Sequence, residues 1–377
     1  MFEPADDTET SGAQRALSRL SVTDFRSHAA ADLSPGPGLI AISGPNGAGK
    51  TNLLEAISLL VPGRGLRRAA LPEMARQQSP GGFAVAARLD MGKGDPIEIG
   101  TGIEPGSARR IVRVNGAGAA ANSLSEWLSV LWLTPAMDRL FTGPAADRRR
   151  FLDRLTLALH PGHAQAATRY EAAMRERNRL LQDGKANDYW LNAVEIEMGR
   201  YGAMVCDARA ATVRSLQSAL KTTAGGPFPE AAIGREGIEP PGADGFTAAL
   251  RTSRPDDLRA GRTLVGPHRD ELIVTHVQKG QPAALASTGE QKALLTGIVL
   301  SHAALVASET GRRPILLLDE ALAHLDEARR VALFGLLGTL GAQVWMTGTD
   351  AALFRAIPGE ATYIEMVDGV PVLRDRE

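Results

Sequence analysis

The sequence predicts an α/β fold with a helical lobe inserted into it, and three observations point to this class. Residues 39–60 read as a short apolar strand, a glycine-rich loop and an amphipathic helix. Residues 313–320 contain a run of apolar residues, typical of a buried parallel strand, that ends on Asp319 and Glu320. Between these segments, residues 125–220 show helical periodicity without glycine loops. The helical block therefore interrupts an α/β domain.

The composition is that of an ordinary globular protein with room for two or three domains. The chain has 377 residues, of which 44% are hydrophobic and 23% charged. Cys206 is the only cysteine, so an internal disulfide is impossible and a reducing compartment is favoured. The first 14 residues lack the features of a targeting signal, and the apolar run 293–307 is short for a bilayer and contains His302. We expect a cytoplasmic protein without membrane contact.

Charge and aromatic content limit the modes of nucleic-acid binding. The net charge is −1, but residues 1–14 carry four acids and no base, which leaves +3 on the rest of the chain. We expect this acidic segment to be a disordered tail. Aromatic residues make up only 5% of the chain, too few for extensive stacking on single-stranded bases. Arginine contacts with the phosphates of duplex DNA fit this composition better.

The glycine-rich loop matches the phosphate-loop pattern G-x-x-x-x-G-K-[ST] at every fixed position. Its residues are Gly44, Pro45, Asn46, Gly47, Ala48, Gly49, Lys50 and Thr51. Glycines let backbone N–H groups turn toward phosphates, and the N-terminus of the following helix adds partial positive charge. Lys50 is expected to reach the β- and γ-phosphates of a nucleotide, and the Thr51 hydroxyl to bind Mg²⁺. The flanking strand and helix argue against a glycine-rich turn that binds nothing.

The strands before and after the loop narrow the class of nucleotide-binding protein. Residues 17–33 read as two short strands, so the phosphate loop follows the third strand. Small GTPases and many kinases place it on the first strand, and the N-K-x-D motif is absent. Residues 83–90 and 97–114 alternate like antiparallel strands. Two arginine clusters in this part are either DNA contacts or a solvated surface: Arg64, Arg67, Arg68, Arg109, Arg110 and Arg113.

The helical block reads as a compact arm. Residues 147–159, 170–181 and 189–220 have amphipathic helical patterns that are not sustained over the many heptads of a coiled coil. Residues 222–245 are rich in glycine and proline and read as an irregular crossing. The predicted segments are the tail 1–14, a first ATPase part 15–124, the arm 125–250 and a second ATPase part 251–377.

The second ATPase part holds two further turns of interest. His268 and Arg269 follow a Gly-Pro turn, where they either cap the turn or contact a phosphate or a partner. Ser287 and Gly289 open an apolar helix, a position that suits either an anion or ordinary helix capping.

The acids after the apolar strand are the expected hydrolytic residues. Asp319, at the carboxyl end of the strand, is placed to hold Mg²⁺ through water, and Glu320 to polarise an attacking water. A further strand at residues 343–346 leads into a loop, 347–350, at the same edge of the sheet.

The order of these pieces resembles the ATP-binding-cassette heads of the SMC type, and among them the RecF family of bacterial recombination mediators. The resemblance covers nearly the whole chain after the tail. The segments that carry it are DFR (24–26), GPNGAGKTNLLEAI (44–57), Gly143-Pro144 with DRRRFLD (147–153), RERN (175–178), GPHRDEL (266–272) and LLLDEALAHLD (316–326).

The resemblance implies a head that forms a homodimer on ATP. Each nucleotide would be held by Lys50 and Thr51 of one subunit and by Ser287 and Gly289 of the other, with Asp326 in the D-loop across the interface. Slow hydrolysis by Glu320 would release the dimer from double-stranded or gapped DNA. The family also implies RecR and RecO as partners, RecA loading, and a role in the DNA-damage (SOS) response.

Some positions depart from the usual cassette pattern. Thr288 stands where many signatures have glycine, the loop 347–350 has no histidine, and a Q-loop glutamine is not assignable beyond the nearby Gln77 and Gln78. Three rival functions fit the sequence less well. A motor or nuclease head predicts long heptad arms or a metal cluster, and a small-molecule kinase leaves Ser287 and Gly289 unexplained. A structural clamp with a dead site conflicts with the intact Lys50, Asp319 and Glu320.

Overall fold

The computed structural model describes residues 15–92, 94–183, 188–222, 226–239, 242–322 and 325–374. The predicted tail 1–14 lies outside the described residues, as does His324 of the LLLDEALAHLD segment. The chain divides into two compact units. Unit 1 consists of Met1–Pro135 and Ala303–Glu377, and unit 2 of Ala136–His302.

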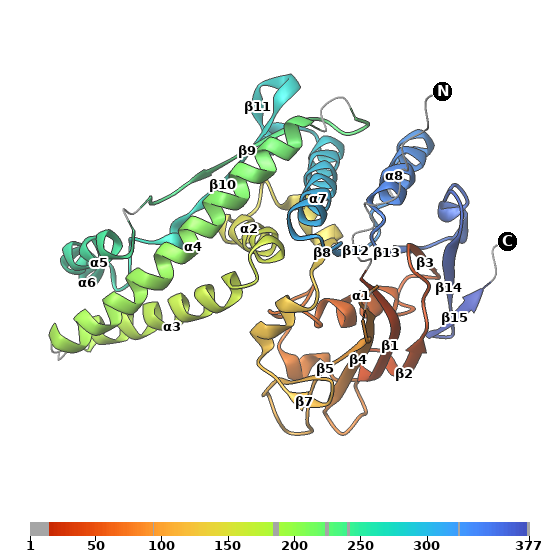
Figure 1. Cartoon of the computed structure of the whole chain (residues 1–377), viewed down its shortest axis with the longest axis horizontal. Helices are drawn as coiled ribbons and strands as arrows, with labels where there is room; N and C mark the ends of the chain where they lie inside the picture. The colour runs from red at the N-terminus through yellow and green to blue at the C-terminus, as the bar shows by residue number, and fades with distance from the viewer. Residues whose placement is uncertain are drawn as a thin grey trace, which may run out of the picture. The chain divides into compact units, whose positions relative to one another are not determined.

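Unit 1 is an α/β domain built on two sheets, and its elements are labelled in Figure 1. Its strands are β1 (Ala16–Phe25), β2 (His28–Leu33), β3 (Leu39–Ser43), β4 (Phe83–Asp90), β5 (Ile97–Ile103), β6 (Ile111–Val114), β7 (Ala117–Gly118), β8 (Val130–Leu133), β12 (Ile315–Leu318), β13 (Val344–Gly348), β14 (Ala361–Val367) and β15 (Val370–Arg374). Its helices are α1 (Lys50–Ser58) and α8 (Glu327–Leu340).

The first sheet is antiparallel, in the order β2-β1-β4-β5-β6-β7. The second sheet is mixed, in the order β15-β14-β3-β13-β12-β8, with only β15 antiparallel to its neighbour. Helix α1 packs Leu53 and Ile57 into one core with Val22 of the first sheet and Ile40 of the second. The phosphate-loop strand β3 is third in the chain, as predicted, and lies between β14 and β13 in the parallel part of its sheet.

Unit 2 is mainly helical, with one small sheet. Its helices are α2 (Ala145–Leu159), α3 (His163–Gln182), α4 (Asp188–Thr222), α5 (Gly242–Thr252) and α6 (Arg254–Ala260), and α7 (Thr288–Thr310) begins in it. Its antiparallel sheet has the order β11-β10-β9, from β9 (Ala231–Glu236), β10 (Glu271–His276) and β11 (Gln281–Pro282). The three predicted helices are confirmed as α2, α3 and α4.

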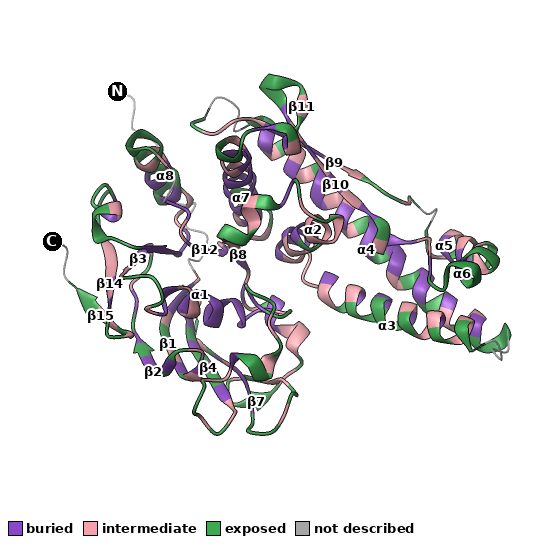
Figure 2. Cartoon of the chain, turned by 180° about the vertical axis from the view of Figure 1, so that it is seen from behind, coloured by how far each residue is buried: buried purple, intermediate pink, exposed green. Residues whose placement is uncertain are grey.

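The long helix α4 organises unit 2, with α3 beside it and α5 against it (Figure 1). Buried positions recur along one stripe of α4, as Figure 2 shows. The helix comes close to α5 at Gly202, where an added Cβ atom would lie 2.0 Å from the ring of Phe246. Tyr170, Met198 and Leu250 complete this small core.

The two units differ from the predicted segments at both boundaries. Residues 125–135 belong to the predicted arm, but β8 pairs in parallel with β12 and extends the mixed sheet of unit 1. Residues 251–302 were assigned to the ATPase part, but β10 pairs with β9 and belongs to unit 2. Strand β9 also replaces part of the predicted irregular crossing. Long-range strand pairing, which local periodicity does not encode, fixes both boundaries.

Helix α7 is longer than the apolar run 293–307, which by itself is short for a bilayer. It spans 23 residues and is long and apolar enough to cross a membrane by length and composition alone. However, 61% of its most apolar window is buried inside the protein. The core helix of a globular protein passes the same test, so this helix is weak evidence for a membrane span.

Candidate nucleotide-binding site

The phosphate loop connects β3 to α1 at the carboxyl end of a central parallel strand. Gly44, Gly47 and Gly49 have φ values of 147°, 82° and 99°. A Cβ atom at Gly44 would lie 2.8 Å from Cβ of Met366, and one at Gly49 would lie 2.8 Å from Oγ of Ser27. The first and last loop glycines are therefore required by space as well as by backbone conformation.

Lys50 is held against its own loop. Its side-chain Nζ donates hydrogen bonds to the carbonyl oxygens of Gly44 at 2.7 Å and Pro45 at 2.9 Å. Burial lowers the pKa of Lys50, and the nearby charges of Glu320 and Asp319 partly offset this effect. An ammonium group has three N–H donors, so one remains for a ligand oxygen. The lysine is thus already positioned at the mouth of the loop.

Thr51 and Asp319 are brought together from opposite ends of unit 1's sequence. The Thr51 hydroxyl donates to Oδ1 of Asp319 at 2.8 Å, and the Thr347 hydroxyl donates to the same oxygen at 2.8 Å. The backbone N–H of Glu320 donates to Oγ1 of Thr347 at 2.9 Å. Asp319 is 6% exposed, so its carboxylate lies at the base of the site.

The oxygens of Thr51 and Asp319 have the chemistry to hold Mg²⁺ beside a bound phosphate. A hydroxyl that donates its proton to a carboxylate keeps lone pairs for a cation, and Mg²⁺ prefers oxygen ligands. Among the described residues, no group of three or more His, Cys, Asp and Glu side chains is arranged to hold a metal ion. The oxygens of Thr51 and Asp319 suit Mg²⁺, which in phosphate sites takes one or two protein ligands together with phosphate and water oxygens.

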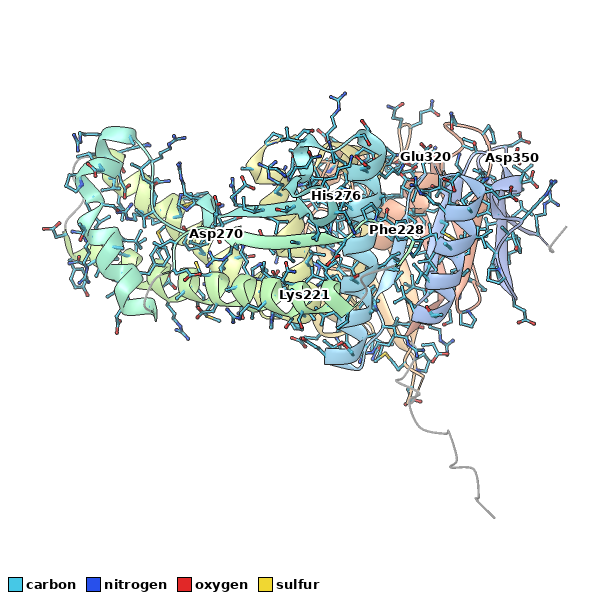
Figure 3. The ribbon with its side chains drawn as sticks, turned by 90° about the horizontal axis from the view of Figure 1, so that it is seen from above. Lys221, Phe228, Asp270, His276, Glu320 and Asp350 are labelled. Atoms are coloured by element: carbon cyan, nitrogen blue, oxygen red, sulfur yellow. The ribbon has the colours of Figure 1, made fainter. Side chains whose placement is uncertain are left out.

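Glu320 has an unusual backbone. Its φ of 50° lies in the left-handed region, which non-glycine residues adopt at a cost of about 1–3 kcal/mol. Such strain concentrates at functional sites, where the surroundings hold it in place. Glu320 and Asp350, labelled in Figure 3, come in the sequence shortly after β12 and β13, which are neighbouring parallel strands. Asp350 caps a short turn by accepting a hydrogen bond from the N–H of Ala352 at 2.8 Å.

The signature residues form the start of α7 in unit 2. Ser287 and Gly289 are exposed. The backbone N–H and the hydroxyl of Ser287 both donate to Oε2 of Glu290 at 3.0 Å. Lys279 lies 2.7 Å from the other carboxylate oxygen, and its hydrogen bond, followed by those of Ser287, lowers the pKa of Glu290 to about 2. The helix end is a capping box in which the serine hydroxyl is already hydrogen-bonded.

Asp326 is the N-cap of α8 in unit 1. Its Oδ1 accepts a hydrogen bond from the backbone N–H of Arg329 at 2.8 Å. Its side chain is 61% exposed. The residue predicted for the D-loop is therefore accessible while it also starts a helix.

The two predicted arginine clusters contain side chains of different kinds. The guanidinium of Arg110 donates to Thr101 at 2.8 Å, to the carbonyl of Gly63 at 2.9 Å and to that of Leu59, just after α1. Burial lowers the pKa of Arg110 to about 10. The guanidinium of Arg110 is therefore used inside the protein, where it satisfies carbonyl groups that follow α1, and this favours a structural role over the predicted DNA contact.

Arg67 is also engaged, since it lies 3.0 Å from Oε2 of the fully buried Glu55. The carboxylate of Glu55 is at the same time paired with Arg26 at 2.7 Å. The exposed arginines of the two clusters are Arg64, Arg67, Arg68, Arg109 and Arg113, of which Arg67 is paired with Glu55.

Two of the segments that carry the family resemblance bind each other in unit 2. Arg148 donates to both carboxylate oxygens of Glu271, at 2.6 and 3.0 Å. Arg209 of α4 lies 2.8 Å from Asp153 and 2.9 Å from Asp270. Asp270 stands at the start of β10 and His276 at its end, as labelled in Figure 3. The strings DRRRFLD and GPHRDEL thus stabilise the join between α2, α4 and β10.

His268 is part of this packing. Its Nε2 donates to the carbonyl of Thr263 at 3.0 Å, so its Nδ1 accepts from the hydroxyl of Tyr170 at 2.7 Å. Burial lowers the pKa of His268 below its usual value. His268 therefore has a local structural role and not the alternative contact with a phosphate or a partner. Arg269, by contrast, is exposed.

Thr347 is the residue of this site that the sequence did not single out for a role. The sequence placed it only in a loop near the crevice. Its hydroxyl reaches Asp319 because β12 and β13 pair in parallel with Leu318 opposite Met346. A hydroxyl residue at the carboxyl end of a buried parallel strand is the one signal that points to it.

Comparison with known proteins gives full-length matches. The sequence model of the RecF/RecN/SMC N terminal domain matches residues 16–368. A protein from Mesorhizobium japonicum named DNA replication and repair protein RecF is 54% identical over 370 residues, which cover 95% of this chain and 97% of that protein. The protein of the same name from Brucella suis is 48% identical over 379 residues, covering 98% and 99%.

Solved structures show the same fold. The structure of the recombination mediator protein RecF-ATPrS in the RecFOR pathway has a TM-score of 0.82 at 22% identity, over 96% of this chain and 99% of that one. An Smc head domain from Pyrococcus furiosus, bound to the C-terminal domain of ScpA, has a TM-score of 0.56 at 14% identity, over 96% of both chains. The predicted SMC-type head fold with a mixed sheet is confirmed.

Proposed function

Because the chain belongs to the RecF family of the RecF/RecN/SMC group, we propose that it is an ATP-dependent DNA-binding recombination mediator. In this proposal, ATP with Mg²⁺ closes a homodimer on double-stranded or gapped DNA, and slow hydrolysis opens it. The proposal rests on one observation: at the carboxyl ends of neighbouring parallel strands, the fold brings together Lys50, Thr51, Asp319 and Glu320.

Nucleotide binding rests on the phosphate loop. Its glycines free the backbone N–H groups for phosphate oxygens, and the N-terminus of α1 adds partial positive charge. Lys50 supplies the full charge from a position already held by two carbonyls. Thr51 and Asp319 would hold Mg²⁺, which when bound supplies charge neutralisation for the β- and γ-phosphates. The matching names of relatives add support, because two of the similar solved structures are RecF-ATPrS and RecF-ATP.

Hydrolysis is assigned to Glu320. Its carboxylate lies just beyond the strand that carries Asp319, on a backbone fixed in the left-handed region. There it would accept a proton of the attacking water as the water oxygen bonds to the γ-phosphorus and ADP leaves. Turnover is expected to be weak and stimulated by DNA, as suits a switch.

The dimer is proposed from the signature on α7. The exposed Ser287 and Gly289 would meet the γ-phosphate bound by a second subunit, with Asp326 at the same interface. This contact requires the Ser287 hydroxyl to exchange its hydrogen bond with Glu290 for one with a phosphate oxygen. ATP would thus be the group that completes an interface between two copies of the chain.

DNA and protein partners follow from the family and from the exposed arginines. Arg64, Arg109 and Arg113 are available for phosphates of duplex DNA. Relatives are named DNA replication and repair proteins, and a similar structure is placed in the RecFOR pathway. On this basis we infer RecO and RecR as partners, RecA loading at gaps, a part in the SOS response, and a cytoplasmic location.

The proposal is tested by measuring binding of the full chain to a fluorescent gapped duplex with Mg²⁺-ATP and with Mg²⁺-ADP. Wild type is expected to bind tightly with ATP and weakly with ADP. Glu320→Gln should stay bound after ATP addition, because hydrolysis no longer releases it. Lys50→Met should show only the weak binding, because the phosphate loop has lost its charge.

The matched control is Lys221→Met, which removes an exposed lysine from the end of α4. It should bind the gapped duplex as wild type does. ATP-independent binding by wild type, or unchanged ATP-dependent binding by Lys50→Met, would contradict the proposal. Wild type that hydrolyses ATP as a monomer and phosphorylates a small molecule would favour the kinase alternative.

A further inference from the structure

The hydroxyl of Thr347 links the two acids of the nucleotide site. Thr347 is fully buried at the carboxyl side of β13. Its Oγ1 accepts a hydrogen bond from the backbone N–H of Glu320 at 2.9 Å and donates one to Oδ1 of Asp319 at 2.8 Å. An N–H group can only donate and a carboxylate can only accept, so the direction of both hydrogen bonds is fixed. The Thr347 hydroxyl thus uses its one proton and one of its two lone pairs in these hydrogen bonds.

The accepted hydrogen bond bears directly on a strained residue. Glu320 has a φ of 50°, which only glycine adopts without cost. A strained backbone persists when neighbouring groups over-determine it. The preceding residue, Asp319, is anchored on the other side of β12, where its N–H donates to the carbonyl of Leu133 at 2.9 Å. From β13, the side chain of Thr347 thus forms hydrogen bonds with both residues of the Asp319-Glu320 turn.

The donated hydrogen bond orients a carboxylate. Oδ1 of Asp319 receives the hydroxyl protons of both Thr347 and Thr51. The other oxygen, Oδ2, accepts none of the hydrogen bonds found within the described ranges 15–92, 94–183, 188–222, 226–239, 242–322 and 325–374. Two donors on one oxygen fix the plane of the carboxylate and leave the second oxygen for water or a cation. Partners of this kind orient metal-binding carboxylates in other proteins.

We propose that Thr347 is a positioning residue for ATP hydrolysis, which holds the backbone of Glu320 and the carboxylate of Asp319 in their working orientations through its hydroxyl. This inference rests on the proposed ATPase function. It predicts that the hydroxyl supports the rate of hydrolysis more than the binding of ATP, because Thr347 contacts the acids and has no hydrogen bond to the phosphate loop among the described residues.

The test compares Thr347→Val, which keeps the shape and removes the hydroxyl, with Thr347→Ser, which keeps the hydroxyl. Steady-state ATPase assays give kcat and KM, and equilibrium binding of a fluorescent ATP analogue gives affinity. Thr347→Val should lower kcat by about 10- to 100-fold, the usual effect of losing such an outer partner. Its ATP affinity should match that of wild type. Thr347→Ser should restore most of kcat.

The matched control is Thr362→Val on β14 of the same sheet. Its hydroxyl accepts one backbone hydrogen bond, from the N–H of Gly36 at 3.0 Å, beside the start of β3 rather than its carboxyl end. This variant should lose stability without a change in kcat per folded molecule. Thr347→Ala serves as a second variant without the hydroxyl, should Thr347→Val not fold.

The possible outcomes separate this inference from the function on which it rests. Wild-type kcat in Thr347→Val or Thr347→Ala would overturn the positioning role and leave the ATPase proposal standing. A loss of ATP affinity with unchanged kcat at saturation would also overturn it. Failure of Thr347→Ser to restore the rate would show that the hydroxyl is not the relevant group. A wild-type protein without hydrolysis would instead refute the ATPase proposal itself.

Discussion

Charged side chains are buried in both units, but they are used differently. In unit 2, Arg177 is fully buried and donates to Glu195, Asp257 and Thr263 and to the carbonyl of Leu250. Four of its five N–H donors are therefore occupied by the protein. In unit 1, Lys50 has two of three donors occupied by its own loop. Most donors of Arg177 are therefore used inside the protein, whereas Lys50 keeps one donor for a ligand.

The same difference separates the sequence strings that carry the family resemblance. RERN supplies Arg177 to one set of buried ion pairs in unit 2. DRRRFLD and GPHRDEL supply side chains to a second set, in which Arg148 pairs with Glu271 and Arg209 pairs with Asp153 and Asp270. The phosphate loop and the Asp319-Glu320 turn supply left-handed backbone and partly used donors at strand ends. A family-specific string is therefore not by itself a binding site. Its role depends on whether the fold has already used its hydrogen-bonding groups.

The largest expected effect comes from breaking the network at Arg177. Arg177→Met leaves the buried carboxylate of Asp257 without its arginine and removes one of the two arginines paired with Glu195, which should cost about 3–5 kcal/mol of unfolding free energy. The control is Arg179→Met on the same helix, whose side chain is 63% exposed and whose loss should change the unfolding free energy little. Denaturant unfolding measures both. Equal losses would show that burial of the network does not determine its contribution.

Acid should weaken a second set of ion pairs in unit 2, in which Asp153 pairs with Arg209 and His163. Burial raises the pKa of Asp153, but the hydrogen bond from His163 and the charge of Arg209 outweigh it and bring the pKa down to about 2. The folded pKa lies below the ordinary value of about 3.9, so this contribution is present above that pH and is lost as pH falls toward 2. The protection of α2 amides against hydrogen exchange should therefore fall as the pH drops between these two values. Asp153→Asn should exchange faster at neutral pH and respond less to acid.

A smaller loss is expected at Arg110, which separates structural from DNA-facing arginines. Arg110→Met removes hydrogen bonds to the carbonyls that follow α1 and should cost about 1–3 kcal/mol of unfolding free energy. Its folded fraction should bind duplex DNA with the wild-type salt dependence. A reduced salt dependence at unchanged stability would return Arg110 to the DNA surface.

The smallest effect on stability is expected for Arg109→Glu combined with Arg113→Glu, since both side chains are exposed. Duplex affinity should fall, and the slope of log affinity against log salt should decrease by about one for each lost phosphate contact. Titrations at several salt concentrations measure this slope. Unchanged affinity and slope would exclude these two arginines from the DNA surface.

Local patterns predicted the elements that depend on short sequence segments. The strand, loop and helix around Lys50, the strand before Asp319, and helices α2, α3 and α4 were all predicted from periodicity and motifs. Strands β8 and β9 were missed, since the first is a four-residue apolar run beside a helical region and the second lies in a glycine-rich one. Their partners are far away in sequence, at β12 and β10.

The same limit applies to the site. The sequence indicated Asp319 and Glu320 because two acids follow an apolar strand after a phosphate loop. It did not indicate the role of Thr347, because that depends on the register between β12 and β13. Nor did it separate Arg110 from Arg109, since only the folded sheet turns one guanidinium toward α1.

The central claim is that ATP completes an interface between two copies of this chain. The most direct measurement is the mass in solution of wild type, Glu320→Gln and Lys50→Met, each with and without Mg²⁺-ATP. The account predicts that Glu320→Gln becomes a dimer only with ATP, whereas Lys50→Met remains a monomer in both conditions. A Glu320→Gln protein that stays monomeric while wild type hydrolyses ATP would contradict the composite site.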